Sequence, residues 1–299
     1  MIRRSIALLH HRETAEMIAT PARGWQVPAR IASASSSTIR SPPMPDPYLP
    51  PLDRLLTLGA EPARRRVWPD YRTLGLEPRH APALVRMAAD PALHAAPERD
   101  RAAWAPIHAW RALAQLGADE AAEPLLALLD QRLDDAWVAD ELPDVLAMIG
   151  PAALPGATLL LFDDARDDDL RIAASAVIAG VGIEHPQRAE EAAAVVRQQL
   201  DDWAHQTPRL NAWLIVHLVE LGAADAAPVM EAAFAAGAVG PEAGDWLGVQ
   251  VDLGLLPEDA LPPPDAEPAP AAQPSPHAAD RARRKRKQAK QTRKRNRDA

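Results

Sequence analysis

The sequence contains no cysteine. A disulfide framework, a thiolate metal site and a cysteine nucleophile are therefore excluded, and the composition is consistent with a reducing compartment. The sequence also lacks any run of 18 uninterrupted apolar residues, about the length that a membrane-crossing helix needs. We therefore predict a cytoplasmic protein with no membrane partner.

Short catalytic motifs are missing as well. There is no G-x-x-x-x-G-K-[ST] phosphate loop, no G-x-S-x-G nucleophile turn and no H-E-x-x-H zinc motif. The sequence Gly180-Val181-Gly182 lacks the third glycine of a dinucleotide-binding loop. We therefore expect a protein that is not an enzyme and has no catalytic residues, no cofactor and no metal site.

Positive charge is scarce in the middle of the chain. Residues 44–280 contain 16 Lys and Arg against 38 Asp and Glu, a charge of about −22, whereas the whole chain carries −8. All four lysines lie in the last part of the sequence, beginning at Lys285. An acidic body repels phosphate over most of its surface, so we expect a nucleic-acid partner only at the tail.

The tail holds eleven cations within residues 281–297 and no aromatic residue. This composition predicts a strand that attracts phosphate without stacking on bases, so any contact with nucleic acid would be non-specific. Three interpretations stay open: binding to RNA, DNA or the ribosome, a nuclear-type targeting run, and a solvated tail that pairs with its own acidic body. The candidate nucleic-acid-binding residues are Arg281, Arg283, Arg284, Lys285, Arg286, Lys287, Lys290, Arg293, Lys294, Arg295 and Arg297.

The ends of the chain differ in composition from the middle. Residues 1–43 contain six arginines and two acids, and we expect a disordered basic leader there. An organellar transit peptide and a translated upstream extension before Met44 are the alternatives. Residues 257–280 are rich in proline and predict a semi-rigid linker, and residues 281–299 predict a disordered basic tail. Residues 44–256 remain for one folded domain.

A helical phrase is repeated within this middle section. Apolar residues stand one, four and eight positions before each of four glycines, and these offsets place them on one stripe of an α-helix. Glycine after the last turn allows the positive φ that often ends a helix. The glycines are Gly117, Gly150, Gly182 and Gly222, spaced by 33, 32 and 40 residues. The stripe residues are Leu116, Ile149, Val181, Leu221, Leu113, Leu146, Ile178, Leu218, Ala109, Leu142, Ala174 and Leu214.

A second helix is predicted after each glycine, at 121–130, 151–162, 189–200 and 225–234. Prolines near the starts of three of them are tolerated, because the first helical N–H groups need no partner within the helix. Pro143 lies inside a first helix and predicts a bend or a late helix start. Short helical pieces at 48–76 and around Trp246 predict terminal caps, and residues 81–93 predict a further helix.

These residues resemble the HEAT-repeat family, in particular the bacterial HEAT-like repeats named after phycobilin lyases. The best matches are HAWRALAQLGADEAAEPLLALLD and DDDLRIAASAVIAGVG, in which Asp169 and Arg171 stand where the family often places an inter-repeat Asp and Arg. The resemblance covers roughly residues 105–237 and implies an all-α fold. That fold would be an α-solenoid of stacked HEAT-like helical hairpins with terminal capping helices.

The resemblance is a poor guide to function, because such repeats occur in scaffolds, adaptors and a few enzymes. A di-iron hydroxylase of the deoxyhypusine type has a similar fold but carries His-Glu dipeptides, and none of the nine histidines here precedes a glutamate. We expect His108 and His217 to be hydrogen-bonded helix residues and not ligands. We expect packing roles, and not an exposed binding ridge, for Trp104, Trp110, Trp137 and Trp213.

Acidic residues cluster at 134–135, 163–164 and 167–169. Asp at such positions commonly caps helices or belongs to loops, and we prefer this interpretation to a cation site. We therefore predict a non-catalytic scaffold or adaptor for another protein, with the basic tail as an auxiliary anchor. The alternative is a bilin-lyase-like enzyme or chromophore-binding chaperone, which an absorbance shift on incubation with a bilin would favour.

Overall fold

The computed structural model describes residues 48–60 and 68–261, which form helices and turns and contain no strand. The all-α prediction is therefore confirmed for this part of the chain. The chain divides after Pro257 into two units, and the described part of the second holds only the 3₁₀ turn Glu258–Ala260. The predicted leader, the basic tail and most of the predicted linker lie outside the described residues.

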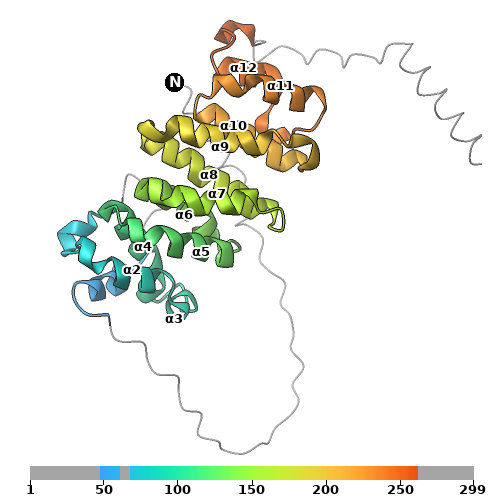
Figure 1. Cartoon of the computed structure of the whole chain (residues 1–299). Coiled ribbons are helices and arrows are strands. Elements are labelled where there is room, and N and C mark those ends of the chain that lie inside the picture. Colours follow the sequence, from blue (N-terminus) through green and yellow to red (C-terminus); the bar gives the residue numbers. More distant parts are fainter. Residues whose placement is uncertain (1–47, 61–67, 262–299) are drawn as a thin grey trace, which may run out of the picture. The chain divides into compact units, whose positions relative to one another are not determined.

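The first unit is a series of α-helices packed against their neighbours (Figure 1). Three 3₁₀ helices precede them in the described residues: η2 (Leu52–Thr57), η4 (Tyr71–Leu74) and η5 (Pro78–His80). The α-helices are α2 (Ala81–Ala88), α3 (Pro91–His94), α4 (Ala105–Leu116), α5 (Ala122–Arg132), α6 (Ala136–Ile149), α7 (Leu154–Phe162), α8 (Asp168–Glu184), α9 (Ala189–Leu200), α10 (Pro208–Glu220), α11 (Ala227–Ala235) and α12 (Trp246–Asp252).

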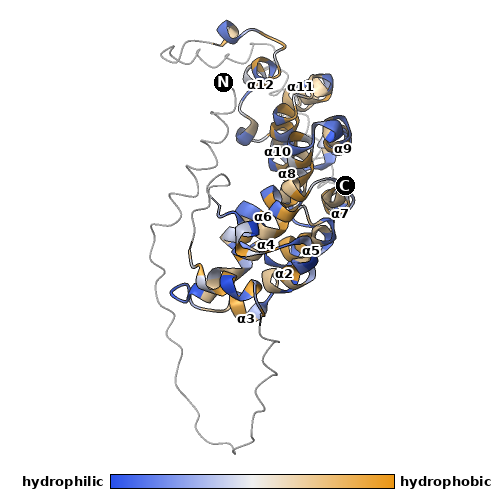
Figure 2. Ribbon diagram, turned by 90° about the vertical axis from the view of Figure 1, so that its left-hand side faces the viewer, coloured by the Kyte–Doolittle hydropathy of each residue, from blue (hydrophilic) through white to orange (hydrophobic). Residues whose placement is uncertain are grey.

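The central helices pack in two layers. In one layer α4 contacts α6, α6 contacts α8 and α8 contacts α10; in the other α5 contacts α7 and α7 contacts α9. Contacts of α5 with α6, α7 with α8 and α9 with α10 join the layers. Figure 2 shows α4, α6, α8 and α10 on one side, and α5, α7 and α9 on the other.

The predicted apolar stripe lies in the core. Ten of its twelve residues are buried, and Leu116 and Leu221 are partly buried against the same core. Leu146 on α6 and Ile178 on α8 are completely buried. Burial of such a side chain stabilises the folded state by about 1.5–3 kcal/mol, so the stripe is a principal source of stability.

Three of the four predicted turn glycines end a helix. Gly117 and Gly222 have φ of 60° and 68°, and the N–H groups of Ala118 and Ala223 donate back to Leu113 and Leu218. This is the hydrogen bonding of a Schellman motif. Gly150 also follows its helix with a positive φ of 105°. The prediction for the fourth glycine is corrected next.

Gly182 does not end a helix, because α8 continues to Glu184. A Cβ atom on Gly182 would lie 2.6 Å from Leu221 Cδ2 and 2.9 Å from the Ala192 Cβ atom. The glycine is therefore needed where α8 meets α9 and the end of α10, and not for a turn.

Two further predictions need correction. The helix expected at 81–93 is two helices, because α2 ends at Ala88 and Asp90 caps α3 by accepting a hydrogen bond from the Ala92 N–H at 2.9 Å. Pro91 follows directly and cannot donate to a continuing helix. The late start considered for the helix containing Pro143 is wrong, since α6 begins at Ala136 and continues through the proline.

The predicted caps contain helices as expected. In η4 Tyr71 is completely buried, while Trp68 and Leu74 pack partly buried against the core, and α12 covers the end of α11. In the described part of the chain no single helix is long and apolar enough to cross a membrane. Only α6 taken together with residues 151–162, across a bend of 116°, meets the length and composition of a span.

Candidate functional site

A buried ion pair joins α4 to α6. Arg111 and Glu141 are 0% and 5% exposed at their side chains, and Arg111 Nε donates to Glu141 Oε2 at 2.9 Å. Trp110 Nε1 donates to the same carboxylate oxygen at 3.1 Å. The Arg111 guanidinium also lies 5.0 Å from the ring centroid of Trp68 and 6.0 Å from that of Trp137. This network fixes the helices relative to one another, and it contains no exposed acid, base or nucleophile.

Both histidines singled out from the sequence are buried and hydrogen-bonded, as predicted. His108 Nε2 lies 2.8 Å from the carbonyl oxygen of Gly59 and its Nδ1 lies 2.7 Å from the Tyr71 hydroxyl. Since a carbonyl can only accept, Nε2 carries the proton. His217 Nδ1 lies 2.8 Å from Ser175 Oγ. These contacts give the two histidines a packing role at helix interfaces.

The acidic clusters act as caps and as links between helices. Asp135 caps α6 by accepting from the Trp137 N–H at 3.0 Å, and Asp163 accepts from the Ala165 N–H at 3.0 Å. The Ala165 N–H and then Arg166 lower the pKa of Asp163. Asp169 pairs with Arg209 of α10. Among the described residues no group of His, Asp and Glu is arranged to hold a metal ion.

The four tryptophans have different environments. Trp110 is buried, which confirms its predicted packing role. Trp104 and Trp137 meet edge to face with ring centroids 5.4 Å apart, and both line a surface pocket of about 360 Å³ together with Trp110. Trp213 is partly buried beside His217. Packing therefore accounts for these rings, although Trp104 and Trp137 also reach the surface.

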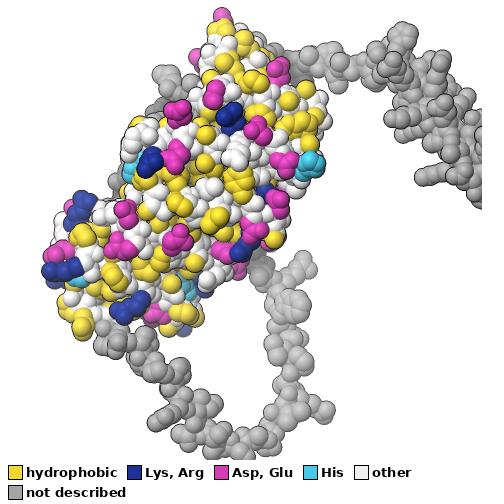
Figure 3. Space-filling view, in the orientation of Figure 1, with side chains coloured by type: hydrophobic (Ala, Val, Ile, Leu, Met, Phe, Trp, Pro, Cys, Tyr) yellow, Lys and Arg dark blue, Asp and Glu magenta, His cyan; other side chains and the backbone are white. Residues whose placement is uncertain are grey.

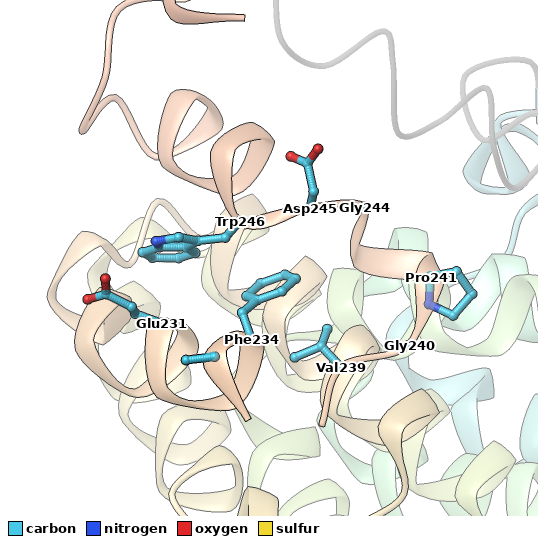
Figure 4. Close-up of a pocket in the computed structure, with 9 residues that line it drawn as sticks. Glu231, Phe234, Val239, Gly240, Pro241, Gly244, Asp245 and Trp246 are labelled. Carbon is cyan, nitrogen blue, oxygen red and sulfur yellow. The ribbon is translucent and has the colours of Figure 1, made fainter. Parts of the chain in front are cut away.

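A larger pocket, of about 630 Å³, lies between α11 and the start of α12. Its apolar wall comes from Phe234 of α11, Val239 of the following loop and Trp246 of α12. The Phe234 and Trp246 ring centroids are 5.8 Å apart, and the ring planes are tilted by 38°. Figure 4 shows the Glu231 carboxylate beside Trp246, and the Asp245 carboxylate on the rim, pointing away from the two rings. We call these lining residues the α11–α12 pocket.

Local hydrogen bonds set the shape of this pocket. Gly237, with φ of 68°, ends α11 and turns the chain back. The Gly240 N–H donates to the Pro208 carbonyl at 2.8 Å, and buried Asn211 donates to the Ala238 carbonyl at 2.8 Å, which holds the loop on α10. Asp245 accepts from the Gly248 N–H at 2.8 Å and so caps α12. The pocket wall is therefore supported by α10 and by the cap of α12.

The surroundings of the pocket are acidic. Residues 210–257 of the first unit contain no Lys or Arg, and the preceding cation, Arg209, is paired with Asp169. Glu231 and Asp245 of the lining are both exposed. More generally, the face of the first unit drawn in Figure 3 carries more acidic than basic side chains. The potential at the pocket therefore favours positive charge.

The sequence-predicted nucleic-acid site, residues 281–297, lies outside the described residues and its arrangement stays a prediction. The α11–α12 pocket was not predicted, although Trp246 was assigned to a capping helix. A cation-free stretch that contains Phe234 and Trp246 is the signal that could have indicated it.

The chain was compared with protein-family models, with curated proteins and with solved structures, and none of them matches it. The assignment to the HEAT-like repeats therefore stays a prediction from the residues quoted above.

Proposed function

We propose that this protein is a non-catalytic adaptor that binds another protein through a HEAT-like α-solenoid. Two layers of helices, each helix in contact with the next in its layer, support the solenoid interpretation. The turns at Gly117, Gly150 and Gly222 recur with the helix pairs. The absence of cysteine is consistent with the cytoplasmic location that we propose.

The observation that carries the proposal is the α11–α12 pocket. Phe234 and Trp246 are only partly covered there, although aromatic side chains of this size usually lie in the core. Exposed apolar side chains with a polar rim are typical of protein-binding surfaces. Leu159 and Phe162, one turn apart on α7 and 75% and 36% exposed, are further exposed apolar side chains of the unit.

Site-specific photo-crosslinking in an extract of the host tests the adaptor function. A photoreactive phenylalanine analogue replaces Ala235, which lines the pocket, or Ala165, which is exposed in the loop before α8. We expect one dominant protein adduct from position 235 and none of the same mass from position 165. Lysine-directed crosslinkers would not label this pocket, because every lysine of the chain lies in the tail. Equal adducts from both positions, or none from either, would contradict an adaptor that uses this surface.

The tail is proposed as an auxiliary anchor that contacts RNA, DNA or the ribosome without sequence preference. With about 6 phosphate contacts, the logarithm of affinity should fall with the logarithm of salt concentration with a slope of about −4 to −5. Titration of RNA with the full-length protein measures this slope. A full-length variant with glutamine at all eleven tail cations is the control. Equal binding by the two proteins would remove the tail from the proposal.

A further inference from the structure

We propose that the α11–α12 pocket recognises a cationic peptide segment of the partner protein, with an arginine side chain laid against Phe234 and Trp246. The inference rests on the proposed adaptor function and names the chemistry of its partner. Three features of the pocket favour a peptide cation as the occupant: the aromatic wall, the carboxylates and the surrounding charge.

The aromatic wall suits a guanidinium group. Phe234 and Trp246 line the pocket with their centroids 5.8 Å apart and their planes inclined by 38°, so the two rings form a wedge. A cation over the face of tryptophan is attracted by the ring quadrupole, and arginine is the side chain most often found there. Its planar group also stacks on aromatic faces, which an ammonium group cannot do.

One carboxylate lies next to the aromatic wall, and a second adds negative charge at the rim. Glu231 lies beside Trp246, and Asp245 lies on the rim (Figure 4). Arginine can rest its aliphatic stem on Val239 and Phe234 while its charged end stays near a carboxylate. An anionic ligand would meet the same two carboxylates and would be repelled.

The surrounding charge strengthens the preference over a longer range. Residues 210–257 contain six Asp and Glu and no Lys or Arg, so the end of the helical unit around α11 and α12 has one sign of charge. Complementary charge of this kind steers a partner towards its site and disfavours partners of the wrong sign. A cationic partner therefore fits both the pocket and its approach.

The test uses the full-length protein and a fluorescently labelled peptide that alternates arginine and alanine. A second labelled peptide, with glutamate in place of arginine, measures the contribution of charge sign. Fluorescence anisotropy gives the affinity of each. We expect the arginine peptide to bind and the glutamate peptide to bind at least about tenfold more weakly, since like-charge placement is disfavoured.

Three variants assign binding to the pocket. Glu231→Gln and Asp245→Asn each remove one charge, and asparagine keeps the oxygen that caps α12, so each should weaken binding by about three- to tenfold. Trp246→Ala should weaken binding by about tenfold or more, as aromatic anchors at interfaces do. Glu190→Gln, at an exposed acid of α9 outside the pocket, is the matched control and should leave affinity unchanged.

The outcomes separate the alternatives. Equal losses from Glu231→Gln and Glu190→Gln would mean that the peptide senses only the acidic surface, and this would overturn the pocket assignment. Trp246→Ala can loosen α12, so its circular dichroism spectrum at the assay temperature must match wild type before its affinity is interpreted. If the spectra differ, the Glu231→Gln result decides the question alone. Unchanged affinity in every pocket variant would also overturn it.

The basic tail of the chain could compete with the peptide for the pocket, and the peptide-binding experiment tests this when the tail cations are replaced. Peptide binding that tightens when the tail cations are replaced by glutamine, and weakens again on adding Glu231→Gln, supports a pocket that selects cations. If replacing the tail cations tightens peptide binding but adding Glu231→Gln does not weaken it again, the result contradicts a pocket that selects cations. The adaptor function is tested separately. Photo-crosslinked adducts at position 235, without a preference for the arginine peptide, would overturn only the cationic partner. A preference for the arginine peptide, without photo-crosslinked adducts, would overturn only the adaptor function.

Discussion

In the first half of the helical unit, between α4 and α6, Trp110 and Glu141 are buried and hydrogen-bonded to each other. At the C-terminal end of the unit, around α11 and α12, Trp246 is partly buried and Glu231 is exposed. The first pair satisfies its polar groups within the protein, which fixes α4 and α6 and leaves no polar group of the pair for a ligand, although Trp104 and Trp137 reach the surface nearby. The C-terminal end keeps both aromatic and acidic groups at the surface. The comparison leads us to expect a large contribution to stability around α4 and α6, and it leaves α11 and α12 for the binding that we propose.

The largest loss of stability is expected from breaking the buried ion pair. Arg111→Met leaves Glu141 buried without its cation and should lower the free energy of unfolding by about 3–5 kcal/mol. The double variant Arg111→Met, Glu141→Leu removes both charges and should recover much of that loss. Urea melts of the two variants measure the difference. A single variant as stable as wild type would show that the pair does not hold α4 on α6.

The next largest effects are expected in the apolar stripe. Leu146→Ala and Ile178→Ala remove side chains that are completely buried, and each should cost about 2–5 kcal/mol. Arg197→Ala on exposed α9 surface should change stability by about 0.5 kcal/mol or less. Urea melts of the three variants give the comparison. Similar small losses in all three would contradict the glycine-based alignment that predicted the stripe.

Sequence analysis predicted these stripe positions because the helical period of the apolar residues is visible within each helix by itself, without knowledge of the neighbouring helices. It could not predict Gly182, since the need for glycine there comes from Leu221 and Ala192, which approach only in the folded chain. The same holds for Arg111 and Glu141, which lie 30 residues apart on different helices. The one local sign was an arginine in the otherwise uncharged helix 105–116.

The candidate site was harder to predict than the core. The pocket depends on the path of residues 237–245, which is fixed by hydrogen bonds to Pro208 and Asn211 on α10. The sequence of the loop has no periodic pattern from which these hydrogen bonds could be predicted. By contrast, the capping helix at Trp246 follows from local signals, because Asp245 is a favourable N-cap residue. Sequence analysis therefore located the helix but not the surface that it completes.

A loss of stability of intermediate size is expected from Gly182→Ala. Alanine favours a helix interior over glycine by about 1 kcal/mol, so local propensity alone predicts stabilisation. The added methyl group would instead meet Leu221 Cδ2 at 2.6 Å and Ala192 Cβ at 2.9 Å. We expect crowding to dominate, with a net loss of about 1–3 kcal/mol in urea melts. A more stable variant would show that α8, α9 and α10 can separate at little cost.

Among the aromatic and core positions considered, the smallest effect on stability is expected from Trp246→Ala at the α11–α12 pocket. The ring is partly buried and packs mainly on Phe234, so its loss removes one aromatic contact and little core volume, and should cost about 1 kcal/mol. Trp110→Ala, by contrast, empties a buried site and removes a donor to Glu141, and should cost at least about 3 kcal/mol. Urea melts monitored by circular dichroism compare the two directly. If Trp246→Ala were as destabilising as Trp110→Ala, its ring would be a core residue in solution, and the contrast between the buried network at α4 and α6 and the exposed pocket at α11 and α12 would fail. A loss of about 1 kcal/mol is the value that a partly exposed ring should give, and it would leave Trp246 available for the partner contact that we propose.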